Sequence, residues 1–356
     1  MPSSPSGSDS PKPKSVSLRH VAETVGVSRM TVSRAFKEDA SIKPELREKI
    51  LKTARELGYS PDTMVSELMT SFASRRPVNY QETFAAIWWP ERWKNVNAGH
   101  GFDSDIYRGL NEGANLHGRG MDHFVLSKDM PPRVIMRMLK ARNIQGVILT
   151  PPASASIGAP DLEWDSLSTV IIGSSLREPK FHRAQASHYT AMVQALGIIG
   201  KRGYKRPCLL VRSDVETRML RAYTAAFLAW GHPKKHIWHA STPETKELPA
   251  WLKRMNPDVI IADWDPWIYY LPEDLGCGYV SLAVRDRDGP ICGVHQNTAS
   301  MAKCAVDLLV RSRLNHEVGE PAEPIFMLTT GTWIEGQSLD PAICRQLSQE
   351  APSPVE

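Results

Sequence analysis

The chain has 356 residues, of which 42% are apolar and 23% are charged, so it is long enough for two or three domains with packed cores. This composition excludes disorder as the dominant state, and no apolar run approaches the roughly 18–20 residues of a membrane helix. The formal net charge of +4 is carried entirely by residues 1–80, which hold 13 basic and 9 acidic side chains. A basic head on a neutral body suggests that the head meets a polyanion.

The chain begins with a Ser-, Pro- and Lys-rich stretch over residues 1–15, which we expect to be a disordered tail. This stretch lacks the apolar core of a signal peptide. The five cysteines are odd in number and contain no CxxC pair, so they predict neither a disulfide framework nor a zinc ribbon. We therefore expect a cytoplasmic protein that has no membrane partner.

Two short helices are predicted within residues 17–37. Ser17 is a good N-cap, and the apolar residues that follow it repeat at helical spacing. Gly26 ends the first helix with a positive φ, and Ser28 caps the second. Ala22 is small at the point where two steeply crossing helices approach most closely. This pattern predicts a helix-turn-helix, and the alternative is an ordinary helical hairpin with solvated arginines.

The outer face of the second helix carries Arg29, Met30, Thr31, Ser33 and Arg34. Arginine can pair bidentately with guanine, whereas Ser and Thr hydroxyls suit phosphates. A third helix is predicted between Pro44 and Gly58, where apolar residues form one stripe. It would complete a three-helix core.

Residues 16–61 resemble the DNA-binding head of the lac-repressor (LacI/GalR) family of bacterial regulators, on the runs VSLRHVAETVGVSRMTVSRAF and ELREKILKTARELGYSP. The resemblance implies that Arg29, Met30 and Arg34 read operator bases in the major groove. Ser28, Thr31 and Ser33 would contact phosphates.

The same family has a hinge helix after the head, whose leucine enters the minor groove and kinks the operator. The segment SPDTMVSELM aligns with this helix and places that leucine at Leu68, within a hinge and linker over residues 62–80. Ser66 and Glu67 stand where small and basic residues are common, and a glutamate facing phosphates is unfavourable. Packing between head and body is the alternative role for Leu68.

The body, residues 81–340, alternates apolar strand-like runs with amphipathic helices, which predicts doubly wound parallel sheets. The predicted strands are residues 84–88, 122–126, 146–150, 169–172, 207–211, 259–262 and 278–281. The predicted helices are residues 103–117, 131–142, 189–202, 218–230, 248–256 and 298–313. Residues 341–356 are expected to be a second tail. No GxGxxG, Walker A, GxSxG or HExxH motif is present, so we expect neither an enzyme nor a cofactor.

The resemblance extends to the body through segments such as IYRGLNEGANLHG and GVHQNTASMAKCAVDLL. It implies two lobes similar to those of periplasmic sugar-binding proteins, which close on a small-molecule effector, usually a sugar. It also implies a homodimer that binds a double-stranded palindromic operator. The expected fold is therefore an all-α helix-turn-helix head with an α/β body of two doubly wound parallel-sheet lobes.

The effector site departs from the family pattern. Ser187 and His188 stand where the family often has an aspartate, and Met219 stands where it often has an arginine. Trp264 replaces an asparagine before an aspartate. The remaining hydrogen-bonding candidates are His188, Arg218, Asp263, Asp265 and Gln296.

Ten tryptophans are many for this length, and aromatic faces stack on sugars and planar ligands. Trp88 and Trp89, at the end of the first body strand, are therefore effector candidates, as Trp93, Trp264 and Trp267 could be. Packing in the core or at a dimer interface is the alternative for each of them.

His232, His236 and His239 would share one face of a helix as metal ligands do, but Gly231 and Pro233 indicate a turn that scatters the rings, so we expect no metal. We therefore interpret the chain as a ligand-responsive transcription repressor. A regulator that has lost small-molecule sensing is one alternative. An enzyme or sugar-binding protein with an incidental helical head is the other.

Overall fold

The structure is a computed structural model that describes residues 18–36, 42–57, 82–99, 101–154, 157–242, 245–272 and 274–349. The chain divides into two compact units, Met1–Tyr80 and Gln81–Glu356, each of which is described by itself. The expected N-terminal tail and the hinge segment with Ser66, Glu67 and Leu68 lie outside the described residues.

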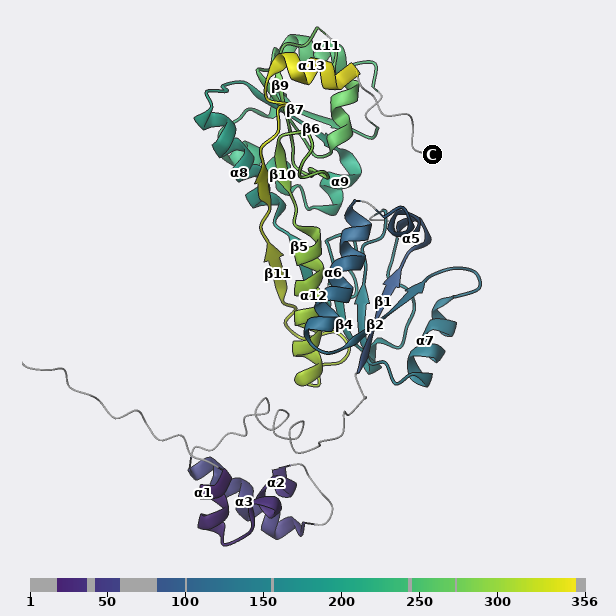
Figure 1. The fold of residues 1–356 in the computed structure, drawn as a ribbon, viewed down its shortest axis with the longest axis vertical. Coiled ribbons are helices and arrows are strands. Elements are labelled where there is room, and N and C mark those ends of the chain that lie inside the picture. The colour runs from purple at the N-terminus through teal and green to yellow at the C-terminus, as the bar shows by residue number, and fades with distance from the viewer. Residues whose placement is uncertain are drawn as a thin grey trace, which may run out of the picture. The chain divides into compact units, whose positions relative to one another are not determined.

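Three helices form the described part of the first unit, as the apolar spacing predicts (Figure 1). They are α1 (Leu18–Val25), α2 (Arg29–Phe36) and α3 (Pro44–Glu56). Each helix contacts the other two, because small and β-branched residues from all three are buried together. These residues are Val21, Ala22, Val32, Ala35, Ile50 and Ala54. Gly26 has φ of 79°, the left-handed conformation that the tight turn between α1 and α2 requires.

The second unit contains two six-stranded sheets (Figure 1). The first has the order β11-β5-β4-β3-β1-β2, and all of its strands are parallel. Its strands are β1 (Thr83–Trp88), β2 (Gly120–Val125), β3 (Gly146–Leu149), β4 (Ser168–Ile172), β5 (His182–Ala186) and β11 (Phe326–Thr329). The accompanying helices are α5 (Pro90–Asn97), α6 (Phe102–Leu116), α7 (Pro132–Ala141), α12 (Thr298–Leu314) and the short η1 (Trp164–Ser166). One face packs against α6 and α12 and the other against α7, so this lobe has a core on each face of the sheet.

The second sheet has the order β12-β10-β9-β8-β6-β7. Its strands are β6 (Pro207–Arg212), β7 (Ile237–Ala240), β8 (Val259–Ala262), β9 (Gly278–Ser281), β10 (Gly293–His295) and β12 (Thr332–Ile334). Its helices are α8 (His188–Lys201), α9 (Ser213–Arg218), α10 (Ala222–Ala229), α11 (Leu248–Met255), α13 (Pro341–Gln349), η2 (Lys234–His236) and η3 (Asp265–Tyr270). Only the edge strand β12 is antiparallel among the described pairings of this sheet. The expected α/β body of two doubly wound lobes is therefore confirmed.

The chain passes between the two lobes three times, after β5, after β10 and after β11. The crossing segments are hydrogen-bonded to one another. Ser187 donates its backbone N–H to the Thr329 carbonyl at 2.8 Å. The Asn297 amide Nδ2 lies 2.9 Å from both the Thr330 carbonyl and the Thr332 hydroxyl. The lobes are therefore joined by a narrow, internally bonded strap.

The helix predicted over residues 218–230 is wrong as a single element. The chain forms α9 and α10 instead, with Leu220 and Arg221 between them at φ of 54° and 59°. A non-glycine residue rarely adopts this left-handed conformation, so two in succession break the helix. The break leaves Arg218 as the last residue of α9.

The tail predicted over residues 341–356 is wrong over its first part, because residues 341–349 form α13. Asp340 accepts a hydrogen bond from the Ala342 N–H at 2.8 Å and so caps this helix. Its buried Cys344 and partly buried Leu347 pack against a core that includes η3 and β9. Strands β5, β7, β10, β11 and β12 were not predicted, because several of them carry polar residues that interrupt the apolar run. Among the described residues, no helix is both long and apolar enough to span a membrane.

We expect Gly109→Ala to destabilise the second unit. Gly109 lies where α6 crosses α12, and a Cβ there would come within 2.3 Å of the Ala299 carbonyl oxygen and 2.8 Å of the Ala302 methyl. Overpacking of this kind costs about 1–3 kcal/mol, which denaturant unfolding of the full chain would measure.

Gly197→Ala is the matched control, because Gly197 lies within α8 and a Cβ there meets nothing within 4 Å. Alanine stabilises an open helix interior by roughly 0.5–1 kcal/mol relative to glycine, so the control should be neutral or stabilising. Equal destabilisation by both substitutions would contradict the close α6–α12 approach.

Candidate functional site

The first candidate surface is the outer face of α2. Arg29, Met30 and Arg34 are all exposed, and Met30 keeps 65% of its surface in solvent although it is apolar. The opposite face of the helix buries Val32 and Ala35. The structure therefore places the three predicted base-reading residues together on the face turned away from the core.

The start of α2 fixes two of the predicted phosphate-contacting hydroxyls. The Ser28 hydroxyl oxygen accepts a hydrogen bond from the Thr31 N–H at 3.1 Å and lies 2.9 Å from the Thr31 hydroxyl. Ser28 therefore caps the helix, as its position predicts. The side chain of Ser33 and all of Leu68 lie outside the described residues, so their contacts with DNA stay predictions.

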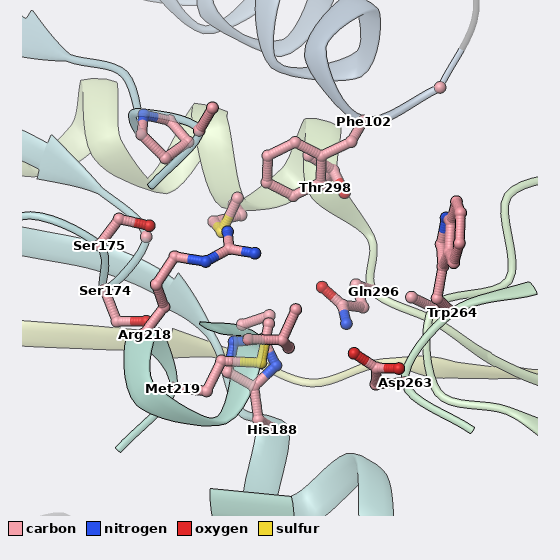
Figure 2. A pocket seen from close by; sticks show the side chains of 18 of the residues that line it. Phe102, Ser174, Ser175, His188, Arg218, Met219, Asp263, Trp264, Gln296 and Thr298 are labelled. Atoms are coloured by element: carbon pink, nitrogen blue, oxygen red, sulfur yellow. The ribbon is translucent and has the colours of Figure 1, made fainter. Parts of the chain in front are cut away.

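The second candidate site is a cavity of about 430 Å³ in the body (Figure 2). Its lining comes from segments that follow the carboxyl ends of β1, β3, β4 and β5 in one lobe and of β6, β8, β9 and β10 in the other. Parallel α/β sheets place their ligand sites at this edge, because the loops of successive strands converge there. The cavity therefore lies where the two-lobed fold predicts a ligand.

Four of the predicted effector residues line this cavity: His188, Arg218, Asp263 and Gln296 (Figure 2). The fifth polar candidate, Asp265, does not. It begins η3, and its carboxylate accepts the Arg285 backbone N–H at 2.9 Å. This carboxylate is committed to holding a loop of the same lobe.

Trp88 and Trp89 do not line the cavity, so their prediction as effector residues is wrong. Trp88 is fully buried on one face of its sheet and donates its indole N–H to His123 Nδ1 at 3.0 Å. Trp89 is buried in the core of the opposite face. Strand residues alternate between faces, and both rings are directed into the two cores that flank the sheet. Trp267 is also buried, whereas Trp264 lines the cavity.

Asp263 is the centre of a buried polar network. Its Oδ1 accepts the Trp267 indole N–H at 2.6 Å, and its Oδ2 accepts the Arg212 Nε–H at 3.0 Å and the Arg212 backbone N–H at 3.3 Å. Burial raises the pKa of this carboxyl, while the Arg212 guanidinium and the Trp267 hydrogen bond oppose that rise. Both carboxylate oxygens are thus satisfied by the protein, and Asp263 fixes the direction of Arg212.

Arg212 was missed by the sequence analysis. It is the last residue of β6, and its guanidinium carbon lies 4.7 Å from the Trp264 ring centroid. Arg285 approaches the same ring at 5.8 Å. Cations are attracted to the face of an indole, so Trp264 holds two arginines beside the cavity. A basic residue at the end of a predicted buried strand was the available sequence signal.

Arg218 reaches into the cavity from the end of α9 (Figure 2). Its side chain is 14% exposed and donates to the half-exposed Asp214 carboxylate at 3.1 Å. Its Nε is buried and has no hydrogen-bond partner among the described residues. Burial lowers the pKa of this guanidinium, and the positive charges of Arg92 and Arg212 lower it further. The described residues therefore satisfy only part of the hydrogen-bonding capacity of this guanidinium.

His188 forms a chain of hydrogen bonds with two neighbours. Its Nδ1 lies 3.2 Å from the Tyr223 hydroxyl, which accepts the Gln296 Nε2–H at 3.0 Å. Burial, followed by repulsion from Arg218, lowers the pKa of His188 to about 4. The imidazole is therefore neutral near pH 7, so one of its two ring nitrogens carries hydrogen and the other is an acceptor.

The opposite lobe contributes a second arginine that was missed. Asp103, which is 2% exposed, accepts from Asn95 Nδ2 at 2.7 Å and from Arg92 Nη1 at 3.4 Å. Arg92 also donates to the Pro152 carbonyl at 3.2 Å and lies 5.8 Å from the Phe102 ring centroid. These bonds hold Arg92 at the cavity wall.

The three histidines with metal-like spacing have separate partners. His236 Nδ1 lies 3.2 Å from the Pro207 carbonyl, His239 Nε2 lies 3.3 Å from the Thr224 hydroxyl, and His232 stacks on Phe227. The turn through η2 therefore directs the rings to different neighbours, as Gly231 and Pro233 predict.

Comparisons with known proteins find similar sequences among bacterial regulators. Residues 17–62 match the family described as bacterial regulatory proteins, lacI family. Over 204 residues, 55% of this chain and 52% of the relative, the chain is 26% identical to the HTH-type transcriptional regulator AglR of Rhizobium meliloti. It is 26% identical over 194 residues to the sucrose operon repressor of Escherichia coli, covering 54% of each chain. The alignments thus span about half the length of these relatives.

Solved structures of similar fold include a complex of the transcriptional regulator CelR with cellobiose, at 19% identity and a TM-score of 0.51, covering 91% of this chain and 99% of that one. The lac repressor dimer bound to operator and an anti-inducer aligns at 14% identity and a TM-score of 0.52, covering 92% of this chain and 100% of that one. At these identities the likeness establishes the fold.

We expect His188 to make the free energy of unfolding fall as the pH is lowered from about 7 to 4. Its folded pKa of about 4 lies below the unfolded value near 6.5, so the unfolded chain binds the extra proton in this window. The stability that the neutral His188 contributes is fully present above pH 6.5. Up to about 3 kcal/mol of the free energy of unfolding is lost by pH 4.

His188→Gln should remove this contribution, so the variant should lose less stability than the parent chain between pH 7 and pH 4. Denaturant unfolding of both proteins at each pH measures the difference, in which the contributions of all other titrating groups cancel. Parallel pH profiles for the two proteins would show that His188 is not held neutral by burial.

Proposed function

We propose that this chain, which belongs to the lacI family of bacterial regulatory proteins, is a sequence-specific transcription repressor that binds a palindromic operator as a homodimer. A small ligand in the cavity of its body would control that binding. The observation that carries the proposal is one chain with two sites: a helix-turn-helix with an exposed basic face, and a ligand-sized cavity between two linked lobes.

The head supports DNA binding through chemistry as well as shape. Arg29 and Arg34 occupy the exposed face of α2, whose opposite face is held by the three-helix core. Guanidinium groups can bind guanine bidentately, and a helix of this width fits the major groove. The excess positive charge of residues 1–80 adds attraction to phosphates, which makes affinity fall as salt rises.

The body supports ligand control. The three crossing segments meet beside the cavity, and Gln296 belongs both to the strap and to the lining. A ligand that contacts both lobes would favour one angle between them, because the strap carries the chain between the two sheets beside the cavity. The solved relative with cellobiose and the lac repressor on its operator support this assignment by analogy of fold.

The alternative of a regulator without a ligand is less well supported. The cavity wall holds Arg218, whose Nε has no hydrogen-bond partner among the described residues, and a ligand could supply that partner. An enzymatic function is also less well supported, because Asp263, the buried carboxylate in the cavity, accepts hydrogen bonds on both oxygens and has no free position for general-base work.

Selection of duplexes from random DNA by the full chain tests the proposal. We expect enrichment of a sequence whose two halves are related by two-fold symmetry, with centres about one helical turn apart. With that duplex, Arg29→Ala should cost on the order of 1–3 kcal/mol of binding free energy and should relax the preference at one base of each half-site.

Arg254→Ala is the control, because it removes the same charge from an exposed position on α11 of the body. It should leave the selected sequence and the affinity unchanged. A selection by the Arg29 variant that is identical to that of the parent chain would contradict the role of Arg29, and failure to enrich any sequence would contradict the proposed function.

A further inference from the structure

We infer that the cavity ligand is an anion, a polyhydroxylated molecule that carries one carboxylate or phosphate group, and that Arg218 binds this group. The inference rests on the proposed function, because it names the chemical class of the molecule that occupies the same cavity. It is carried by the uneven placement of positive and negative charge around the lining.

Four arginines and four carboxylates line the cavity, so its formal charge is balanced, but the two signs lie at different depths. Glu91 is exposed in the first turn of α5. Asp105 pairs with the exposed Arg108 at 2.5 Å, and the Asp214 side chain is 53% exposed. Three of the four negative charges are therefore solvated or neutralised away from the interior.

The fourth carboxylate, Asp263, is fully buried, and its two oxygens accept hydrogen bonds from Arg212 and Trp267. It therefore holds a cation at the wall, and its side chain, which is 0% exposed, offers no accessible surface to a ligand. A ligand that enters the cavity accordingly meets guanidinium groups before it meets any unpaired carboxylate.

The inner cations are Arg92, Arg212 and Arg218, whose side chains are 14–25% exposed. Arg92 and Arg212 each act to lower the pKa of Arg218, which is the electrostatic signature of mutually repelling charges. The Nε atoms of Arg92 and Arg218 are both buried without a hydrogen-bond partner among the described residues. Arg92 and Arg212 are each paired with a buried carboxylate, Asp103 and Asp263. The carboxylate that pairs with Arg218, Asp214, is 53% exposed, so Arg218 is the least compensated of the three cations and the one that an anion would stabilise most.

The contacts of Trp264 also favour an anionic ligand over a neutral sugar. An open indole face would suit the apolar face of a neutral sugar, but Arg212 and Arg285 approach this ring at 4.7 and 5.8 Å. The Trp264 ring packs against a core of its own lobe and also contacts these two cations beside the cavity.

The remaining polar lining fits hydroxyl groups. Ser174 and Ser175 lie on one side of Arg218 and Gln296 lies on the other (Figure 2). His188 is neutral near pH 7, so it can exchange a hydrogen bond with a hydroxyl without adding charge. The central arginine suits an anionic group of the ligand. The neutral donors and acceptors around it suit the hydroxyl groups of the same molecule.

Unfolding and calorimetric titration of the full chain with matched probes test the inference. Glucose, glucuronate and glucose 6-phosphate share one ring and differ in the group on C6, and galactose, galacturonate and galactose 6-phosphate form a second series. Gluconate adds an open-chain acid. We expect at least one anion to raise the unfolding midpoint by several degrees at saturation, with its neutral counterpart at least 10-fold weaker. The carboxylate and phosphate members distinguish the two sources of negative charge.

Arg218→Gln should weaken binding of that anion by about 10- to 100-fold, because hydrogen bonds to a charged group are lost. Asp214→Asn should strengthen it, since it removes the carboxylate that competes for Arg218. Arg254→Gln is the matched control: it removes the same charge from an exposed residue of α11 outside the lining and should leave affinity unchanged. If Arg218→Gln fails to fold, Arg218→Lys should keep the preference for anions with reduced affinity.

Binding of neutral sugars in preference to their anions would overturn the inference while leaving the proposed function intact. Binding of none of the anions would also overturn it. Equal loss of anion affinity in Arg218→Gln and Arg254→Gln would show a general effect of charge and no specific site. Failure of the proposed function is recognised separately, because it appears in the duplex selection, which needs no ligand.

Discussion

Three crossings of the chain between its two sheets are the constraint on which the body depends. Strand β11 reaches the first sheet only after α12 has returned from the second, and β12 then completes the second sheet. Because β5 and β10 both end at the crossings, the carboxyl edges of the two parallel sheets face one cavity. The hydrogen bonds of Asn297 to Thr330 and Thr332 hold the crossings together.

The charges of the cavity follow from the same topology. Arg212 and Asp263 end or follow the neighbouring strands β6 and β8, so a strand register sets their separation. Their pairing removes the carboxylate from use and turns the arginine toward Trp264. Arg218 reaches the cavity because the chain breaks at Leu220 and Arg221, whose left-handed backbone prevents α9 from continuing. Strained backbone of this kind persists where the surrounding structure holds it and where it positions a side chain for function.

The sequence predicts the head well, because Gly26, Ser28 and the spacing of Val21, Ala22 and Val32 are local requirements that one turn and one helix pair must satisfy. It predicts the cavity only in part. Arg218 and Gln296 were found, but Trp88 was not separable from a core residue, because the last position of a strand can face either sheet surface or the open edge. Arg212 was missed, since its importance depends on Asp263, which is 51 residues away in the chain and meets it only through strand pairing.

The claim that joins these parts is that occupancy of the cavity changes DNA binding by the head. It is tested most directly by measuring the affinity of the full chain for its selected duplex with and without the cavity ligand at saturation. We expect a change of about 5- to 150-fold, and the affinity for the ligand should change by the same factor when the duplex is present, because coupling between two binding sites is reciprocal. The same duplex affinity in both conditions, with the ligand shown to be bound, would contradict the claim.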